Sequence, residues 1–101
     1  MFLHGKKAAH LKKEKEKARQ IRRSRWWQNK ISHCSCYYCG MDLTPEAVTM
    51  DHILPLSRGG SSNKGNLATA CKNCNNRKKN LTPVEWVAYL DGSLNKQNSP
   101  E

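Results

Sequence analysis

The sequence predicts a small α+β domain held together by a metal ion, with a basic helix before it and a short helix after it. The chain has 101 residues, of which 37% are apolar and 7% aromatic, so its hydrophobic core is small and would gain stability from a bound metal. Four of its five cysteines form two pairs with a two-residue gap inside each pair. Between and after these pairs, short apolar runs typical of strands alternate with segments typical of helices.

Residues 1–31 are the predicted basic helical arm. They hold eleven Lys and Arg against two Glu, a net charge of +9, whereas residues 32–101 hold seven against six. The stretch 6–30 contains no Gly or Pro and consists mostly of good helix formers. We expect its inner end, near Trp26 and Trp27, to dock on the domain. The alternative is a solvated and partly disordered arm, because like charges repel one another. Such a block of positive charge favours nucleic acid as the partner.

Residues 32–92 are the predicted globular domain, and residues 93–101 a disordered tail. The pattern predicts, in order, a helical turn at 44–46, a strand over 48–53, a loop rich in Gly, Ser and Asn over 55–66, a returning strand over 67–70 and a helix over 71–79.

A last helix is predicted after Thr82, because Thr82-Pro83-Val84-Glu85 matches a capping box with proline at the first helical position. Asp91-Gly92 ends this helix. Trp86 is assigned to the core, and Val84, Val87, Ala88 and Leu90 together with Trp86 make the predicted helix amphipathic.

The predicted ligands of a structural zinc ion are Cys36, Cys39, Cys71 and Cys74. A two-residue gap lets one turn present two sulfurs to the same ion, and two such turns complete a tetrahedron. Cys34 is the spare cysteine; it could replace Cys36, although it is separated from Cys39 by four residues. The odd number of cysteines and the short gaps favour zinc in a reducing compartment over a disulfide framework.

Several motifs occur in order between residues 36 and 79. They are Cys36-x-x-Cys39, Asp51-His52-Ile53-x-Pro55, Gly59-Gly60, Asn66-Leu67 and Cys71-x-x-Cys74-Asn75-x-x-Lys78. In this order they resemble the HNH endonucleases with zinc-binding knuckles, whose fold is of the ββα-metal type. The resemblance covers a little under half of the chain and makes residues 32–92 the expected nuclease domain.

The resemblance implies a role for each residue of the site. His52 would be the general base that takes a proton from the water attacking a phosphodiester. Asp51 and Asn75 would hold a catalytic divalent ion, Mg²⁺ or Mn²⁺, with Ni²⁺ or Zn²⁺ as alternatives. Asn66 would brace the loop and orient the histidine. The expected products carry a 3′-hydroxyl and a 5′-phosphate.

The residue types themselves suit this chemistry, because a divalent cation neutralises charge on a phosphate and imidazole accepts protons near neutral pH. Each residue also has a purely structural alternative. His52 could be a core or capping histidine, Asp51 a turn cap and Asn75 a helix cap. Adjacent residues on a strand point to opposite faces, so Asp51 and His52 need a strand end or a kink to share one site.

Basic residues on both sides of the site are candidates for contacts with phosphate groups: Arg77, Lys78 and Lys79 after it, and Arg22, Arg23 and Arg25 in the arm. A solvated charged face is the alternative for the first group. For Trp26 and Trp27, stacking on bases is the alternative to docking.

The sequence therefore predicts a metal-dependent endonuclease that hydrolyses DNA, most plausibly double-stranded. The alternative is a zinc-ribbon-like module that binds nucleic acid without cutting it. A protein partner could supply target specificity, because few residues are obvious base readers. The resemblance implies a bacterial or phage-encoded cytoplasmic protein. In agreement, residues 1–31 lack the apolar run of a signal peptide, and no stretch is long enough to cross a membrane.

Overall fold

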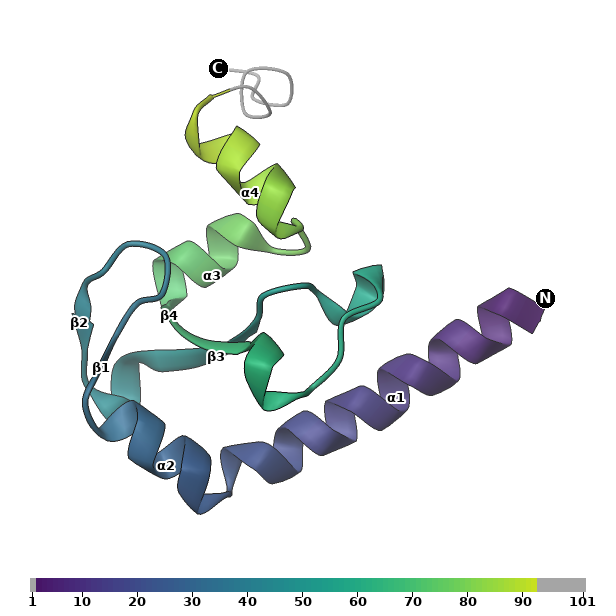
Figure 1. Ribbon diagram of the computed structural model, residues 1–101, viewed down its shortest axis with the longest axis horizontal. Coiled ribbons are helices and arrows are strands. Elements are labelled where there is room, and N and C mark those ends of the chain that lie inside the picture. Colours follow the sequence, from purple (N-terminus) through teal and green to yellow (C-terminus); the bar gives the residue numbers. More distant parts are fainter. Residues whose placement is uncertain (1, 93–101) are drawn as a thin grey trace.

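A β-hairpin and the helix that follows it form the centre of the molecule (Figure 1). The computed structural model describes residues 2–92, so the tail expected at 93–101 lies outside the described residues. Strand β3 (Val48–His52) pairs antiparallel with β4 (Leu67–Cys71), and α3 (Lys72–Lys78) follows β4 directly. Every residue of β4 is buried. Both predicted strands, the predicted helix after them and the α+β class are confirmed.

A second, smaller hairpin carries the first cysteine pair. It consists of β1 (Cys34–Ser35) and β2 (Asp42–Leu43), which pair antiparallel. No strand is predicted from the sequence for either segment. The hairpin is tied to β4 because Tyr37 N donates to Thr69 O at 2.8 Å, and the Thr69 hydroxyl donates to Ser35 O at the same distance. The helical turn predicted at 44–46 is present as a single 3₁₀ turn at Pro45–Ala47.

The basic arm forms two helices instead of the single helix that the sequence predicted. Helix α1 (Phe2–Arg22) ends shortly before α2 (Arg25–Ser32) begins. The reason is Ser24, whose hydroxyl accepts a hydrogen bond from Trp27 N at 3.2 Å and so caps a new helix. Trp27 is buried, which confirms the predicted docking of the inner end.

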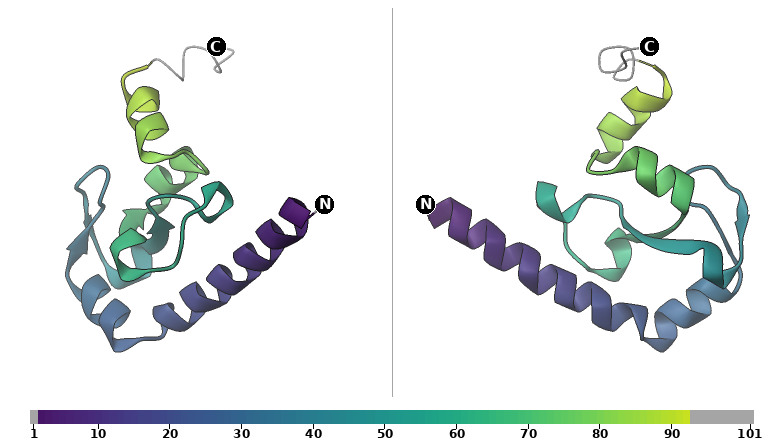
Figure 2. Two further views of the ribbon diagram at one scale, coloured as in Figure 1. Left: turned by 45° about the vertical axis from the view of Figure 1, so that its right-hand side comes forward. Right: turned by 180° about the vertical axis from the view of Figure 1, so that it is seen from behind.

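Helix α1 also docks through its middle, along the loop that joins β3 to β4 (Figures 1 and 2). Ala18 and Glu14 are buried there, with 2% and 5% of their surface exposed. The arm is therefore packed along much of its length and is not a solvated extension.

Helix α4 (Pro83–Leu90) begins with the predicted capping box, and both of its hydrogen bonds, between Thr82 and Glu85, are present. Trp86 is buried as predicted. The apolar side chains of Val84 and Val87 on this helix are 79% and 62% exposed. The helix is held through ring contacts of Trp86 and through ion pairs of 2.9–3.0 Å between Arg58 and Glu85, so it does not need an apolar stripe.

Among the described residues, no helix combines the length and the apolarity that crossing a lipid bilayer requires.

Candidate metal centre and active site

The four predicted zinc ligands come together in one cluster. The sulfur atoms of Cys36, Cys39, Cys71 and Cys74 all lie within 4.8 Å of one another. In a tetrahedral site with Zn–S bonds of about 2.3 Å, neighbouring sulfurs are about 3.8 Å apart, and the separation between Cys39 Sγ and Cys71 Sγ is 4.0 Å. The donor set and its dimensions fit a structural zinc ion, whereas Cys34 is outside the cluster.

Backbone N–H groups surround the sulfurs and stabilise negative charge on them. Cys36 Sγ accepts from Tyr38 N and Cys39 N, and Cys71 Sγ accepts from Cys74 N at 3.3 Å. Burial opposes ionisation of Cys36, but such N–H groups outweigh it and lower the pKa of this thiol to about 7. Burial raises the pKa of the Cys74 thiol instead. A divalent cation would favour the thiolate form of all four.

The residues predicted to hold the second cation and to act as the base line one cleft. This cleft has a volume of about 320 Å³, and its walls include Asp51 and His52 at the end of β3 and Asn75 on α3. Leu11 and Lys15 of α1 complete the wall on the side of the arm. Helix α1, strand β3 and helix α3, which are far apart in the sequence, thus line the same cleft.

Asp51 and His52 direct their polar atoms to different neighbours, as expected for adjacent strand residues. Asp51 is buried, and its Oδ2 atom accepts a short hydrogen bond from the Tyr38 hydroxyl. The same oxygen lies 3.5 Å from Lys78 Nζ. Because His52 is the last residue of β3, its backbone and side chain are next to the loop that follows.

The imidazole of His52 is half-buried and lies 3.0 Å, through Nε2, from the hydroxyl of Ser62. Burial is the main cause that lowers the pKa of His52 below its ordinary value, and the negative charge of Asp51 opposes this shift. The ring is therefore held in its neutral form, in which it can accept a proton.

The amide group of Asn75 is oriented by Thr49. The Thr49 hydroxyl donates to the carbonyl of Ala70 at 2.9 Å, and Asn75 Nδ2 donates to the same hydroxyl at 2.8 Å. The hydroxyl has a single proton, which it gives to the carbonyl, so it can only accept from Asn75. This fixes the nitrogen of the amide toward Thr49 and leaves its oxygen available as a ligand.

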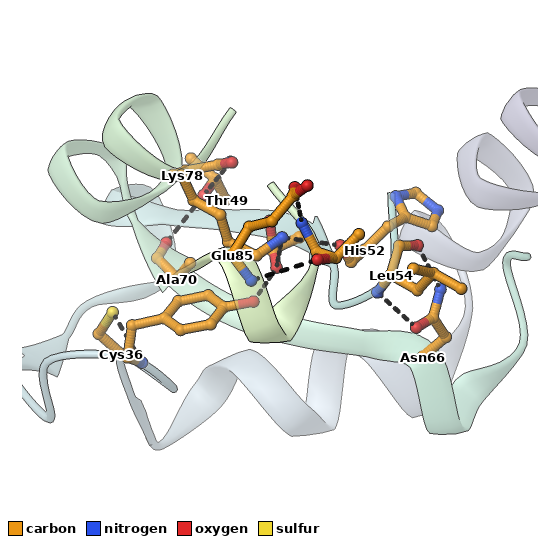
Figure 3. Close-up of polar contacts among 12 residues, drawn as sticks. Cys36, Thr49, His52, Leu54, Asn66, Ala70, Lys78 and Glu85 are labelled. Atoms are coloured by element: carbon orange, nitrogen blue, oxygen red, sulfur yellow. Dashed lines mark hydrogen bonds and ion pairs between the residues drawn. The ribbon is translucent and has the colours of Figure 1, made fainter. Parts of the chain in front are cut away.

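Asn66 joins the two ends of the loop between the strands (Figure 3). Its Oδ1 accepts from Leu54 N at 2.8 Å, and its Nδ2 donates to Leu54 O at 3.0 Å. Gly60 lies against the same carbonyl so closely that a Cβ atom would be 1.8 Å from Leu54 O. The loop that follows His52 is therefore closed by contacts that require an amide at one position and a glycine at the other.

Comparison with known proteins agrees with this geometry. The model of a family described as "HNH endonuclease" matches residues 36–87, slightly more than half of the chain. The chain belongs to the HNH endonuclease family. The matched segment contains the sulfur cluster together with Asp51, His52 and Asn75 of the cleft.

Two curated relatives of this HNH protein are CRISPR-associated endonucleases Cas9. The protein of Actinomyces naeslundii is 36% identical over 58 residues, and that of Corynebacterium diphtheriae is 40% identical over 56 residues. These alignments cover 56% and 54% of this chain but only 5% of each relative. The likeness thus concerns a short segment of each relative.

The basic residues near the HNH site differ in how accessible they are. Lys78 is fully buried, because it follows buried Cys74 by four positions and both lie on the inner face of α3. Its amine also donates to His52 O at 3.2 Å, so the prediction that it contacts phosphate does not fit this position. Arg77 is exposed and lies over the rings of Trp86 and Tyr89.

The other predicted basic contacts are exposed, and two of them adjoin the site. Lys79 is part of the wall of the cleft, and Arg22 lines a neighbouring hollow with His52 and Lys15. Arg23 and Arg25 are exposed at the junction between α1 and α2.

Sequence reasoning missed the residues that orient the HNH side chains, namely Tyr38, Thr49 and Ser62. No motif marks them, because hydroxyl-bearing residues are common and only their contacts distinguish these three. Glu14 pairs locally with Lys17 and is also buried against Ser62, a contact that no sequence motif indicates. Its spacing from Leu11 and Ala18 places it on the inner face of α1 and could have indicated its burial.

Proposed function

We propose that this protein is a metal-dependent endonuclease that hydrolyses phosphodiester bonds of double-stranded DNA, with His52 as the general base. The observation that supports this most strongly is the shared cleft of Asp51, His52 and Asn75. A base and two oxygen ligands that line the same cleft satisfy the requirements for metal-assisted hydrolysis of a phosphodiester.

Asp51 and Asn75 would hold the catalytic cation. Carboxylate and amide oxygens are ligands that Mg²⁺ and Mn²⁺ prefer. Oδ2 of Asp51 is engaged with Tyr38 and Lys78, so we assign Oδ1 to the cation, together with the amide oxygen that Thr49 leaves available on Asn75. When bound, the divalent cation supplies positive charge that stabilises the oxygens of the scissile phosphate.

His52 would take a proton from the attacking water. Its lowered pKa keeps the ring unprotonated at neutral pH, which a general base requires. Lys15 and Arg22 border on the hollows beside His52, two helical turns or about 10 Å apart along α1. We assign to them the phosphates on either side of the cut, because they are the exposed cations of the arm nearest to the site.

The partners of Asp51 favour a second candidate function, a zinc-held module that binds nucleic acid without cutting it. A lysine beside the carboxylate competes with a divalent cation for the same charge. Cleavage assays distinguish the two functions directly.

The decisive experiment is a nicking assay on supercoiled plasmid with Mg²⁺ or Mn²⁺ and with the zinc-loaded protein. We expect the wild-type protein to nick DNA and His52→Ala to lose about 10²–10⁴-fold in rate while binding DNA with unchanged affinity. His33→Ala is the matched control, because His33 is exposed and outside the cleft. Equal rates for His52→Ala and wild type would reject His52 as the base, and absence of cleavage with every divalent cation would favour the binding module.

A second experiment addresses the arm. The double variant Lys15→Ala/Arg22→Ala should lower DNA affinity and reduce the slope of log K against log salt by about 1.8, the value for two lost phosphate contacts. Lys13→Ala/Arg23→Ala removes the same charge from another face of α1 and from the turn that follows it, and is the control. If both double variants change the slope equally, the arm binds DNA without the specific register proposed here.

A further inference from the structure

A chain of hydrogen bonds connects the imidazole of His52 to the backbone of helix α1 through Ser62. Ser62 lies in the loop between β3 and β4 and is only 1% exposed. Its Oγ atom lies 2.6 Å from the backbone oxygen of Glu14 and 3.0 Å from Nε2 of His52. Its backbone N donates to Oε1 of Glu14 at 2.6 Å. One residue of the loop is thus held from two sides by one residue of the arm.

The positions of the protons in this chain follow from the donors and acceptors. A serine hydroxyl has one proton, and a backbone carbonyl can only accept. The Ser62 hydroxyl therefore donates to Glu14 O and can only accept from His52. The hydrogen on the ring must be on Nε2, so the neutral imidazole has its lone pair on Nδ1.

We propose that helix α1 positions the general base: Glu14 and Ser62 hold His52 as the Nε2–H tautomer, so that Nδ1 is the nitrogen that accepts the proton from the attacking water. The role of Nδ1 rests on the proposed function, whereas the tautomer does not. Ser62 and Glu14 act only through His52 and are positioning residues. Similar hydrogen bonds to histidines that ligate metals fix the tautomer and the ring orientation.

The arm is well suited to this task because several contacts hold it against the loop. Besides the two bonds to Glu14, His10 Nε2 lies 2.9 Å from Gly60 O, and Lys17 pairs with Glu14 at 3.6 Å. The hydrogen bond from Ser62 N is the main cause that lowers the pKa of Glu14, so this buried carboxylate stays ionised as an acceptor. One face of α1 therefore anchors the loop, while its other faces carry the exposed basic residues.

The tautomer can be measured by NMR without any substrate. In the ¹⁵N-labelled full chain loaded with zinc, at a pH where His52 is neutral, long-range ¹H–¹⁵N spectra distinguish protonated from unprotonated ring nitrogens. The signals of His52 are identified by their loss in His52→Gln. We expect a protonated Nε2 and an unprotonated Nδ1. The Nδ1–H tautomer, or comparable amounts of both, would overturn the proposal.

Variants separate positioning from folding. Ser62→Ala removes the acceptor, so we expect mixed tautomers and a kcat lowered by about 10–100-fold, with unchanged DNA affinity. Ser61→Ala removes the neighbouring hydroxyl and should retain the wild-type spectrum and kcat. A single Nε2–H tautomer and a full kcat in Ser62→Ala would refute the role of Ser62.

The contribution of the arm is tested at Glu14. Glu14→Gln keeps an oxygen for Ser62 N and should keep the tautomer, whereas Glu14→Ala removes it and should give the spectrum of Ser62→Ala. An unchanged spectrum in Glu14→Ala would exclude the Glu14 side chain from this positioning role, because the variant keeps the backbone carbonyl that accepts from the Ser62 hydroxyl. The NMR spectra report the tautomer whether or not the protein cuts DNA. A protein that has the expected tautomer but fails to cut DNA would therefore contradict the proposed function and not the tautomer.

Discussion

The sulfur cluster and the cleft around His52 are built by different means. The cluster uses two short turns, and every group that could touch the metal is a cysteine within one compact set. Asp51, His52 and Asn75 of the cleft come from β3 and α3, and each of them is contacted by a residue outside this set of three. Thr49 orients Asn75, Ser62 contacts His52, and Tyr38 and Lys78 hold Asp51.

This difference follows from the demands of the two tasks. Four thiolates around zinc are chemically equivalent and select their own tetrahedral geometry once they are close together. A base and an amide ligand are asymmetric groups, so each must present one particular atom to the reaction. Neighbouring donors and acceptors have to make that selection. Loss of one cysteine should therefore abolish zinc binding by the cluster. In the cleft, loss of a residue that orients a side chain should already impair the site.

The largest expected effect is at the cluster. Cys71→Ser should release zinc and unfold the domain, because binding of a structural zinc contributes about 10–16 kcal/mol to the folding of comparable small domains. Zinc content and far-UV circular dichroism measure this. Cys34→Ser is the control and should retain one equivalent of zinc and the native spectrum. Retention of one full equivalent of zinc in Cys71→Ser would show that Cys71 is not a zinc ligand.

The next effect tests whether the support of Asp51 is structural. Lys78→Met should lower the free energy of unfolding by about 3–5 kcal/mol, because it leaves a buried carboxylate without its cation. Lys79→Met changes the exposed neighbour and should have little effect. Denaturant titrations of the two variants give the comparison, and equal stabilities would mean that the buried pair contributes nothing.

Orientation of Asn75 is tested with Thr49. Thr49→Val keeps the shape of the side chain but removes the hydroxyl that accepts from Asn75, so affinity for Mn²⁺ should fall by about 10–100-fold. Thr49→Ser retains the hydroxyl and should bind Mn²⁺ nearly as well as wild type. Titration calorimetry of the zinc-loaded proteins is suitable. Equal affinity of all three would show that Asn75 needs no such support.

The smallest effect concerns pH. Burial lowers the pKa of His52, so its neutral form should persist to lower pH than that of a free histidine. The rate constant kcat/KM should accordingly fall on the acid side with a midpoint below the ordinary value of 6.5. Nicking rates over a pH series provide the measurement, and a midpoint above that value would contradict a desolvated base.

Local chemistry made much of the fold predictable. The cysteine pairs, the capping box at Thr82 and the apolar runs of the two central strands depend on residues close together in the chain, so each was recognised from the sequence. The break at Ser24 was missed because serine is also tolerated inside helices, and only the contacts of the docked Trp27 favour a new helix there.

The sequence by itself therefore determined the cysteine cluster, the central hairpin with its helix, and the set of residues from which a nuclease site can be made. Only the tertiary structure decided which polar atoms of these residues are engaged by neighbours, that Lys78 is buried, and that helix α1 contacts the loop after His52 through Glu14 and Ser62. The physical reason is that spacing along the chain fixes local geometry, whereas the direction of a hydrogen bond depends on partners as far apart as residues 14 and 62.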